Sequence, residues 1–372
     1  MSNDIFSRLN PGISDLAPYE PGRPIDDVAK EYGISNIIKL ASNENPLGAS
    51  PKALRSIADL DDSLHLYPDG NCTELKNAIA HHEKVAEESV ILGNGSNEVL
   101  ELIARAWLNP SRNAITSRHA FAVYKIVTQA AGAKLIEVEA KNWKFNLEAF
   151  HSHINEETAV IFIANPNNPT GTYNSHKEIE DFLSNVPSNI LVVLDCAYYE
   201  YVQENDYVDV NQLLNKYENL IVTKSFSKIQ GLAAIRLGYG LANASLIESL
   251  NRIRQPFNIN SYAQEIAINL LDDKKFLKNS IAHNLYWKKW LTNKFNDLGF
   301  EVIPSVANFI MVKFKSEKQA SKLADSLEKS NIFIRKLNNY KLSDCLRISI
   351  GSEKDLKKLF REVKKITAGT NK

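Results

Sequence analysis

The chain has 372 residues, of which 44% are hydrophobic, and its 44 Lys and Arg residues balance 44 Asp and Glu residues. This length allows a large core and favours two domains. A formal charge of zero gives no general attraction to nucleic acid or to an anionic membrane, so any anion would be bound by a local cluster of charges.

Metal, disulfide and membrane classes are also disfavoured. The three cysteines, Cys72, Cys196 and Cys345, have no CxxC spacing, and the histidine pairs at 81–82 and 151–153 have no suitably spaced third ligand. No apolar run approaches the roughly 20 residues that span a bilayer. The first residues, MSNDIFSRLNPGIS, lack the pattern of a signal peptide. We therefore expect a reduced, cytoplasmic protein without a metal site.

The N-terminal part of the chain differs in composition from the remainder. Residues 1–45 are rich in Pro and Gly, which predicts an extended arm. Residues 51–60 and 73–84 have helical patterns, and residues 89–107 predict a short buried strand, a Gly-rich turn and a helix.

Three later segments predict buried strands that end in polar residues. They are AVIFIANPNNPTG (159–171), NILVVLDCAYYEYV (189–202) and NLIVTKSFSK (219–228). Strands that alternate with helices indicate a parallel sheet covered on both faces. We expect a large α/β domain over residues 46–275 and a smaller α+β domain over residues 276–372.

Polar side chains at these strand ends are the candidate site, because ligands of such sheets bind beyond the carboxyl ends of the strands. Asp195 directly follows a buried strand, where a carboxylate is costly without a positive partner. Tyr198 comes three residues later, Asn168 lies in the Pro-rich turn after another strand, and Lys228 follows the third strand after Ser225 and Ser227.

An anion-binding group is predicted nearby. The turn GNGSNE at 93–98 opens a helix, so the backbone N–H groups of Gly95, Ser96 and Asn97 can face an anion, and Arg236 can supply countercharge. Together these groups suit pyridoxal phosphate as a cofactor. They provide a cradle for its phosphate, a carboxylate for its cationic ring nitrogen, two hydrogen-bonding groups and an amine. The amine forms a Schiff base with its aldehyde, and the carboxylate keeps the ring able to accept electrons.

Taken singly, each of these residues also has an ordinary structural interpretation. Lys228 could be a strand-end lysine, Asp195 a turn residue and Asn168 part of the turn chemistry alone. Tyr67 and Tyr19 could be packing tyrosines. Phe121 could be a core residue, and Arg335 and Arg347 could belong to solvated strand faces.

The motifs together resemble those of fold-type I, pyridoxal-phosphate-dependent aminotransferases, and among them the histidinol-phosphate aminotransferase family. The resemblance covers essentially the whole chain and is carried by ASNENPLG, YPDG, GNGSNEVLELIARAW, FAVY, ANPNNPTG, VVLDCAYYEY, SFSKIQGLAAIRLGYG, RQPFNIN, ANFIMVKF and CLRISIG. It implies a large domain with a mostly parallel seven-stranded sheet flanked by helices, a smaller C-terminal domain, an N-terminal arm that packs with the small domain and the partner subunit, and a homodimer.

The resemblance also implies roles for individual residues. Lys228 would hold the cofactor and move a proton from the substrate Cα. Asp195 would pair with the ring nitrogen, and Asn168 and Tyr198 would bond the ring oxygen. Phe121 would stack on the ring. The remaining cofactor contacts would come from Gly95, Ser96, Asn97, Ser225, Ser227, Arg236 and, toward the neighbouring subunit's cofactor, Tyr67. The substrate's anionic end would be held by Asn43, Arg335, Arg347 and Tyr19 of the partner subunit.

The implied reaction converts histidinol phosphate and 2-oxoglutarate to imidazole-acetol phosphate and glutamate by a ping-pong mechanism in histidine biosynthesis. The alternatives are an aromatic-amino-acid aminotransferase, a threonine-phosphate decarboxylase and, in another class, the non-catalytic aminotransferase-like half of a transcription regulator. Three departures from the family pattern are Cys196 after the aspartate, the lead-in SRHAF at 117–121, and Phe121 where tyrosine is frequent.

Overall fold

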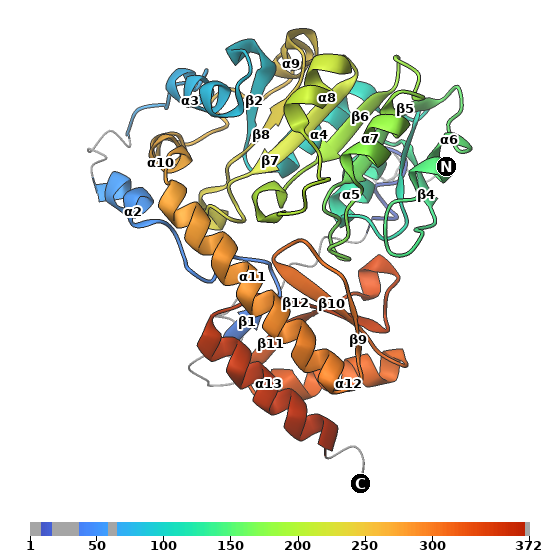
Figure 1. Ribbon diagram of the computed structural model, residues 1–372. Coiled ribbons are helices and arrows are strands. Elements are labelled where there is room, and N and C mark those ends of the chain that lie inside the picture. The colour runs from blue at the N-terminus through green and yellow to red at the C-terminus, as the bar shows by residue number, and fades with distance from the viewer. Residues whose placement is uncertain (1–8, 17–36, 59–64, 369–372) are drawn as a thin grey trace.

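The larger of two β-sheets carries the strands predicted from the sequence. The computed structural model describes residues 9–16, 37–58 and 65–368. Seven strands form this sheet in the order β2-β8-β7-β6-β5-β3-β4 (Figure 1). Among them β8 runs antiparallel to both neighbours, and the pairs formed by β4, β3, β5, β6 and β7 are parallel. The prediction of a mostly parallel seven-stranded sheet is confirmed. The bounds are β2 Val90–Gly93, β3 Asn113–Ser117, β4 Lys134–Val138, β5 Thr158–Ala164, β6 Leu191–Asp195, β7 Leu220–Ser225 and β8 Gly238–Leu241.

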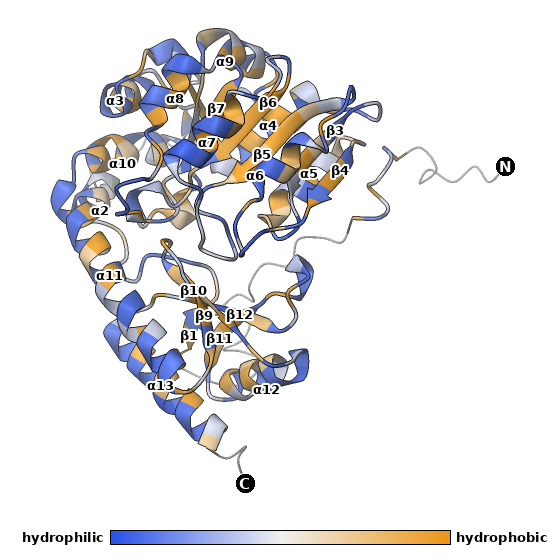
Figure 2. Cartoon of the chain, turned by 45° about the vertical axis from the view of Figure 1, so that its right-hand side comes forward, coloured by the Kyte–Doolittle hydropathy of each residue, from blue (hydrophilic) through white to orange (hydrophobic). Residues whose placement is uncertain are grey.

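The three central strands are buried along their whole length, which explains their unbroken apolar sequences. Every residue of β5, β6 and β7 is buried, and Figure 2 shows the middle of the sheet as its most hydrophobic part. Strands covered on both faces have no solvent side, so their sequences show no alternation of apolar and polar residues.

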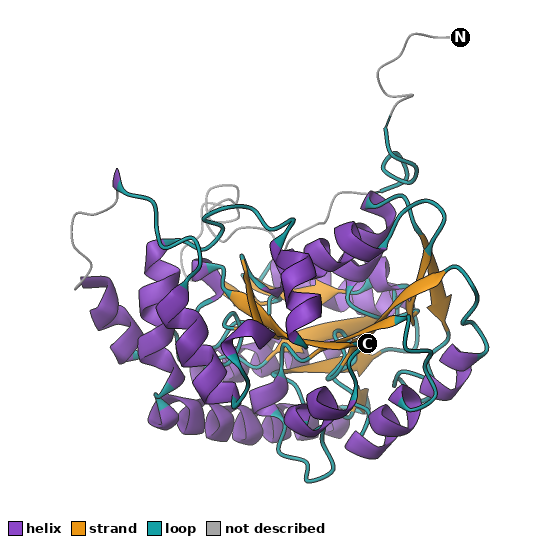
Figure 3. Cartoon of the chain, turned by 90° about the horizontal axis from the view of Figure 1, so that it is seen from above, coloured by secondary structure: helices purple, strands orange, loops and turns teal. Residues whose placement is uncertain are grey.

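Helices lie on both sides of this sheet (Figure 3). The helix α4 packs against β2, β7 and β8, α5 against β3 and β4, and α8 against β7, while α10 packs on α2 and α3. The bounds are α2 Pro51–Ala58, α3 Thr73–Glu83, α4 Ser96–Trp107, α5 Ala122–Ala130, α6 Leu147–His151, α7 His176–Leu183, α8 Val210–Lys216, α9 Ala244–Asn251 and α10 Ser261–Leu271.

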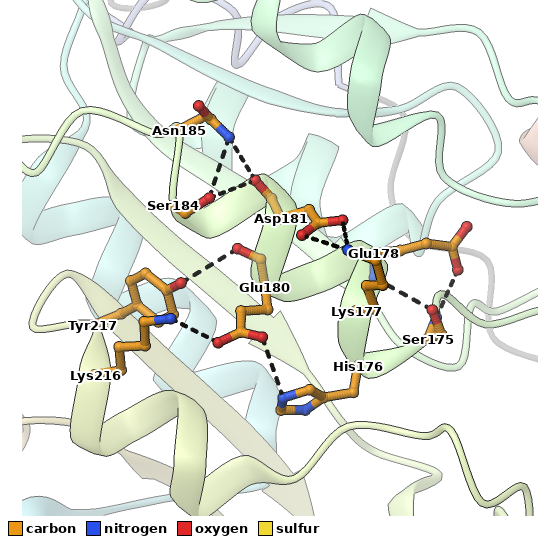
Figure 4. Close-up of polar contacts among 10 residues, drawn as sticks. All are labelled: Ser175, His176, Lys177, Glu178, Glu180, Asp181, Ser184, Asn185, Lys216 and Tyr217. Carbon is orange, nitrogen blue, oxygen red and sulfur yellow. Dashed lines mark hydrogen bonds and ion pairs between the residues drawn. The ribbon is translucent and has the colours of Figure 1, made fainter.

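Polar contacts fasten α7 to α8 on the outside of the large sheet (Figure 4). Ser175 and Glu178 form a capping box that satisfies N–H groups at the start of α7. The Glu180 carboxylate accepts a hydrogen bond from Lys216 Nζ at 2.7 Å, and the Glu180 carbonyl accepts one from the Tyr217 hydroxyl at 3.3 Å. Exposed ion pairs of this kind each add little stability, so we assign the contacts to helix placement.

A second sheet, of five strands, lies below the first in Figure 1. Its order is β1-β11-β12-β10-β9, with β1 parallel to β11 and the other pairs antiparallel. Its apolar core is packed by α11, α12 and α13. The bounds are β1 Ile38–Leu40, β9 Glu301–Ile303, β10 Phe309–Lys313, β11 Ile332–Lys336, β12 Cys345–Ser349, α11 Lys274–Asp297, α12 Glu317–Glu328 and α13 Glu353–Ala368.

The segment before residue 46 contributes to this second sheet through β1, which pairs with β11 from residue 38 to residue 40. The predicted divisions after residues 45 and 275 stay predictions, and most of the predicted arm lies outside the described residues. No helix in the described part of the chain has the length and apolar character to cross a bilayer.

Candidate active site

The carboxyl ends of β5, β6 and β7 open onto a cavity of about 250 Å³ that lies between the two sheets. This is the location expected for a ligand of a parallel α/β sheet. Residues 41–44 close the cavity together with Arg335, Tyr340 and Arg347, which come from the part of the chain that forms the smaller sheet. Its lining includes Asn43, Ser96, Asn97, Phe121, Asn168, Asp195, Tyr198, Ser225, Ser227, Lys228, Arg236, Arg335, Tyr340 and Arg347.

Asp195 is a buried carboxylate at the end of β6. Its Oδ2 accepts a hydrogen bond from the hydroxyl of Tyr124 at 2.8 Å, and its Oδ1 accepts one from the backbone N–H of Ala197 at 3.2 Å. Burial raises the pKa of Asp195, while the hydrogen bond from Tyr124 acts in the opposite direction. The charge of Lys228 also acts to lower the pKa of Asp195, and a further cation in the cavity would favour the ionised carboxylate more strongly.

Lys228 and Tyr198 face the same space. The Lys228 ammonium lies 5.6 Å from the centre of the Tyr198 ring and donates to the backbone carbonyl of Ser42 at 3.4 Å. Burial raises the pKa of Tyr198, against which Arg347 acts, so the phenol is neutral. Its oxygen accepts from Asn43 Nδ2 at 2.9 Å, and the hydroxyl can still donate its own hydrogen.

The N-terminus of α4 and Arg236 form an anion-binding cradle. Arg236 Nη1 donates to Ser227 Oγ at 3.3 Å, and the Arg236 carbonyl accepts from the backbone N–H of Gly95 at 3.0 Å. Gly95 has φ 77° and ψ 161°, and a Cβ built there would come closer than 3.0 Å to Nη2 of Arg236. Only glycine leaves room for the guanidinium beside the first turn of α4, where backbone N–H groups and the helix dipole favour an anion.

Two arginines stand side by side on the opposite wall. Arg335 of β11 and Arg347 of β12 are paired residues in an antiparallel ladder, so their side chains leave the sheet on the same face. Arg347 is buried and donates to Asn168 Oδ1 and to the carbonyl of Ala41. Among the described residues, its Nε has no acceptor. Two adjacent guanidinium groups repel each other unless an anion lies between them, so this wall suits a strongly anionic ligand.

The structure brings most of the predicted site residues together at this cavity. Tyr67 is an exception within its own chain: it is 81% exposed and stacks on Phe257 with 4.6 Å between ring centres. Tyr19 lies outside the described residues. Ser225 accepts from the backbone N–H of Ser227 at 3.1 Å, and Asn43 has a left-handed φ of 57°.

Two residues that the sequence interpretation missed also belong to the site. Tyr124 bonds Asp195, and Tyr340 lines the cavity. Tyr124 lies within the FAVY motif, one helical turn after Phe121, and this spacing could have indicated it. For Tyr340 no sequence signal exists, because it follows β11 in a short 3-10 turn whose place is set by packing in a cluster with Ile303, Met311 and Leu342.

Comparisons with known proteins agree with the resemblance seen in the sequence. The family model described as aminotransferase class I and II matches residues 35–363. Histidinol-phosphate aminotransferase 2 of Pseudomonas fluorescens is 46% identical over 99% of this chain and all of the relative. A protein of the same name from Hydrogenovibrio crunogenus is 44% identical, with full coverage of both chains.

A solved structure gives the same picture. Histidinol-phosphate aminotransferase from Sinorhizobium meliloti, in complex with pyridoxal 5'-phosphate, has a TM-score of 0.91 and 25% identity, and the match covers 99% of this chain and 100% of that one. The expected fold-type I architecture is thereby confirmed. With its matching family model and its full-length relatives, this chain belongs to the class I and II aminotransferases.

Proposed function

We propose that this protein transfers the amino group of histidinol phosphate to 2-oxoglutarate with pyridoxal phosphate as cofactor. The observation that carries the proposal is the arginine pair, Arg335 and Arg347, across the same cavity as the amine of Lys228 and the carboxylate of Asp195. The names of the full-length relatives support the same substrate.

The side chains of the cavity fit the cofactor. The cradle made by Gly95, Ser96 and Arg236 suits its phosphate, because a side chain at residue 95 would fill the space that the guanidinium occupies. Asp195 is a buried carboxylate, and its pKa is raised by burial. A protonated ring nitrogen beside Asp195 would lower this pKa again, because an adjacent positive charge favours the ionised carboxylate. When bound, pyridoxal phosphate supplies a ring that accepts the electron pair left on the substrate Cα.

The chain's own residues would perform the remaining tasks. Lys228 Nζ would bond covalently to the cofactor aldehyde and, once displaced by the donor's amine, take the proton from the substrate Cα. Tyr124 holds Asp195 in place through its hydroxyl, and Asn168 is oriented by Arg347. Phe121 lines the cavity and would pack on the cofactor ring.

The arginine pair explains how one site would accept both substrates. Histidinol phosphate carries a phosphate and no carboxylate, whereas glutamate carries two carboxylates. A planar guanidinium binds either group through two parallel hydrogen bonds. The Nε of Arg347, which has no acceptor among the described residues, provides a donor for such an oxygen.

The decisive experiment compares donors on the purified protein loaded with pyridoxal phosphate. Histidinol phosphate, phenylalanine and threonine phosphate are each supplied with 2-oxoglutarate, and the glutamate formed is measured. We expect turnover to be fastest with histidinol phosphate. Good activity with phenylalanine and none with histidinol phosphate would instead indicate an aromatic aminotransferase, and release of carbon dioxide from threonine phosphate would indicate a decarboxylase.

We include a homodimer in the cytoplasm in the proposal. Exposed Leu66 and Tyr67, with Phe257 stacked on the tyrosine, make an apolar surface that a second copy would cover. The three cysteines are free and buried, as suits a reducing compartment. Sedimentation at working concentration tests the dimer, and a fully active monomer would disprove it.

A further inference from the structure

A contact surface between the two sheets runs beside the cavity, and we call it the seam. On the large-sheet side it consists of His119, Ala122 and Trp143, and on the small-sheet side of Lys313 and residues 337–342. Ala122 and Trp143 pack against a buried cluster that includes Leu337, Tyr340 and Leu342. The Lys313 ammonium lies 5.2 Å from the centre of the Trp143 ring. The two sides of the seam are therefore held together both by apolar packing and by the contact of the Lys313 charge with the Trp143 ring.

His119 is held from both sides of the seam. Its ring Nδ1 lies 2.7 Å from the carbonyl oxygen of Tyr340, and its own carbonyl accepts a hydrogen bond from Asn167 Nδ2 at 3.1 Å. A carbonyl only accepts, so Nδ1 carries the hydrogen. The residue thereby links the turn that contains Asn168 to the segment that contains Tyr340.

Both ends of this link border the cavity. Phe121 lies two residues after His119, and Tyr340 lines the cavity from the other side, close in sequence to Arg335. A second bond across the same boundary joins Lys341 Nζ to Glu137 Oε2 at 2.6 Å. Because this ion pair is partly exposed, it holds the segment less firmly than the half-buried bond from His119.

We infer that His119 is a positioning residue, which sets the separation between the cofactor side of the cavity and the substrate wall formed by Tyr340 and Arg335. The inference rests on the proposed function only for the identity of the amino donor.

The reacting groups are held by other contacts. Asp195 is fixed by the hydroxyl of Tyr124 and the backbone N–H of Ala197, and the amine of Lys228 lies beside the carbonyl of Ser42. The bond from His119 goes instead to the Tyr340 segment, on the substrate wall. Loss of this bond should therefore weaken donor binding more than it slows the chemical step.

Three variants test the hydrogen bond. His119→Leu keeps the bulk and removes the donor, whereas His119→Asn places an amide N–H near the former Nδ1 and should rescue the bond. His153→Leu is the matched control, because His153 makes the same kind of contact, to the carbonyl of Ala149 at 2.8 Å, in the exposed turn after α6 and outside the lining of the cavity. If His119→Leu does not fold, His119→Ala decides the same question.

We expect His119→Leu to raise KM for histidinol phosphate by about threefold to tenfold, as the loss of one hydrogen bond does, with kcat within about twofold of the parent. In the cofactor-free protein, amide hydrogen exchange in residues 337–342 should become faster in this variant. His119→Asn and His153→Leu should resemble the parent protein in both measurements.

The inference would be overturned if His119→Leu left KM unchanged or left amide hydrogen exchange in residues 337–342 unchanged. It would also be overturned if His119→Leu and His119→Asn changed KM and exchange equally. The exchange measurement needs neither donor nor cofactor. If the parent protein fails to use histidinol phosphate, the proposed function fails, and the exchange comparison still decides the role of His119.

Discussion

The anion cradle yields the sharpest prediction, through the substitution Gly95→Ala. Gly95 has φ 77° and ψ 161°, a backbone region that residues with a Cβ scarcely occupy. The added methyl would also come closer than 3.0 Å to Nη2 of Arg236. The guanidinium must therefore leave its place beside the first turn of α4, or the turn must move away from the guanidinium.

The size of the effect follows from these two consequences. Backbone strain at such a position costs about 1–3 kcal/mol of folding free energy. If Arg236 binds the cofactor phosphate as we propose, displacing its guanidinium would remove a charge-assisted hydrogen bond worth about 1.5–3 kcal/mol. At about 1.4 kcal/mol for each factor of ten, the dissociation constant for pyridoxal phosphate should rise by about one to two orders of magnitude.

The assay is a titration of cofactor-free protein with pyridoxal phosphate, followed by absorbance, together with thermal unfolding. Gly299→Ala is the matched control, because Gly299 has φ 80° and its Cβ would meet nothing within 4 Å. The control should lose stability, by about 1–2 kcal/mol, and keep cofactor affinity. Normal affinity in Gly95→Ala, or an equal loss in both variants, would refute the assignment of the cradle.

The remaining predictions concern the reacting groups and the core. Lys228→Ala should lower kcat by about 10² to 10⁴-fold, and borohydride treatment should no longer fix cofactor to the protein; persistent activity would contradict the mechanism. Asp195→Asn should lower kcat by about 10² to 10³-fold, measured with saturating cofactor so that weak binding is not mistaken for slow chemistry. Arg347→Lys should raise KM for histidinol phosphate about tenfold because one fork of two donors is lost, and an unchanged KM would place the phosphate elsewhere. In the core, the carboxylate of Glu83 accepts from Lys224 Nζ at 2.8 Å; burial alone would raise the pKa of Glu83, but the Lys224 charge brings it below its usual value. The stabilisation from this pair is therefore present above the ordinary carboxyl pKa and is lost as pH falls through the lowered pKa of Glu83. Glu83→Gln should reduce the free energy of unfolding by about 3–5 kcal/mol at neutral pH, because it leaves the Lys224 charge buried without its partner. The variant should also lose the part of the acid dependence that comes from Glu83, which denaturant unfolding across a pH series would measure.

Much of the fold was predictable because it depends on local patterns. The strands β5, β6 and β7 are unbroken apolar runs that end in polar residues, and the carboxyl ends of adjacent parallel strands meet at one edge of a sheet. Asp195 and Lys228 could therefore be assigned to one site from their positions in the chain. The Gly-rich turn before α4 indicated an anion site for the same reason.

Long-range contacts were not predictable in this way. The bond from Tyr124 to Asp195 joins residues 71 apart, and that from Arg347 to Ala41 joins residues 306 apart. Arg236 has a left-handed backbone conformation directly after a short 3-10 turn, and from there its Nη1 donates to Ser227 Oγ. Pairing across a cavity depends on how separate elements pack, and sequence spacing carries no such information.

The amino-acid sequence by itself determined the buried apolar strands β5, β6 and β7 and their polar ends, and it indicated Lys228, Asp195 and the turn at 93–98 as candidates for one site, because each of these signals depends on neighbours within a few residues. Only the tertiary structure decided that Arg335 and Arg347 lie side by side, that β1 joins the smaller sheet, and that His119 bridges to Tyr340. The physical reason is that strand register and the packing of one sheet over another are set by the summed burial of many side chains, which no short stretch of sequence contains.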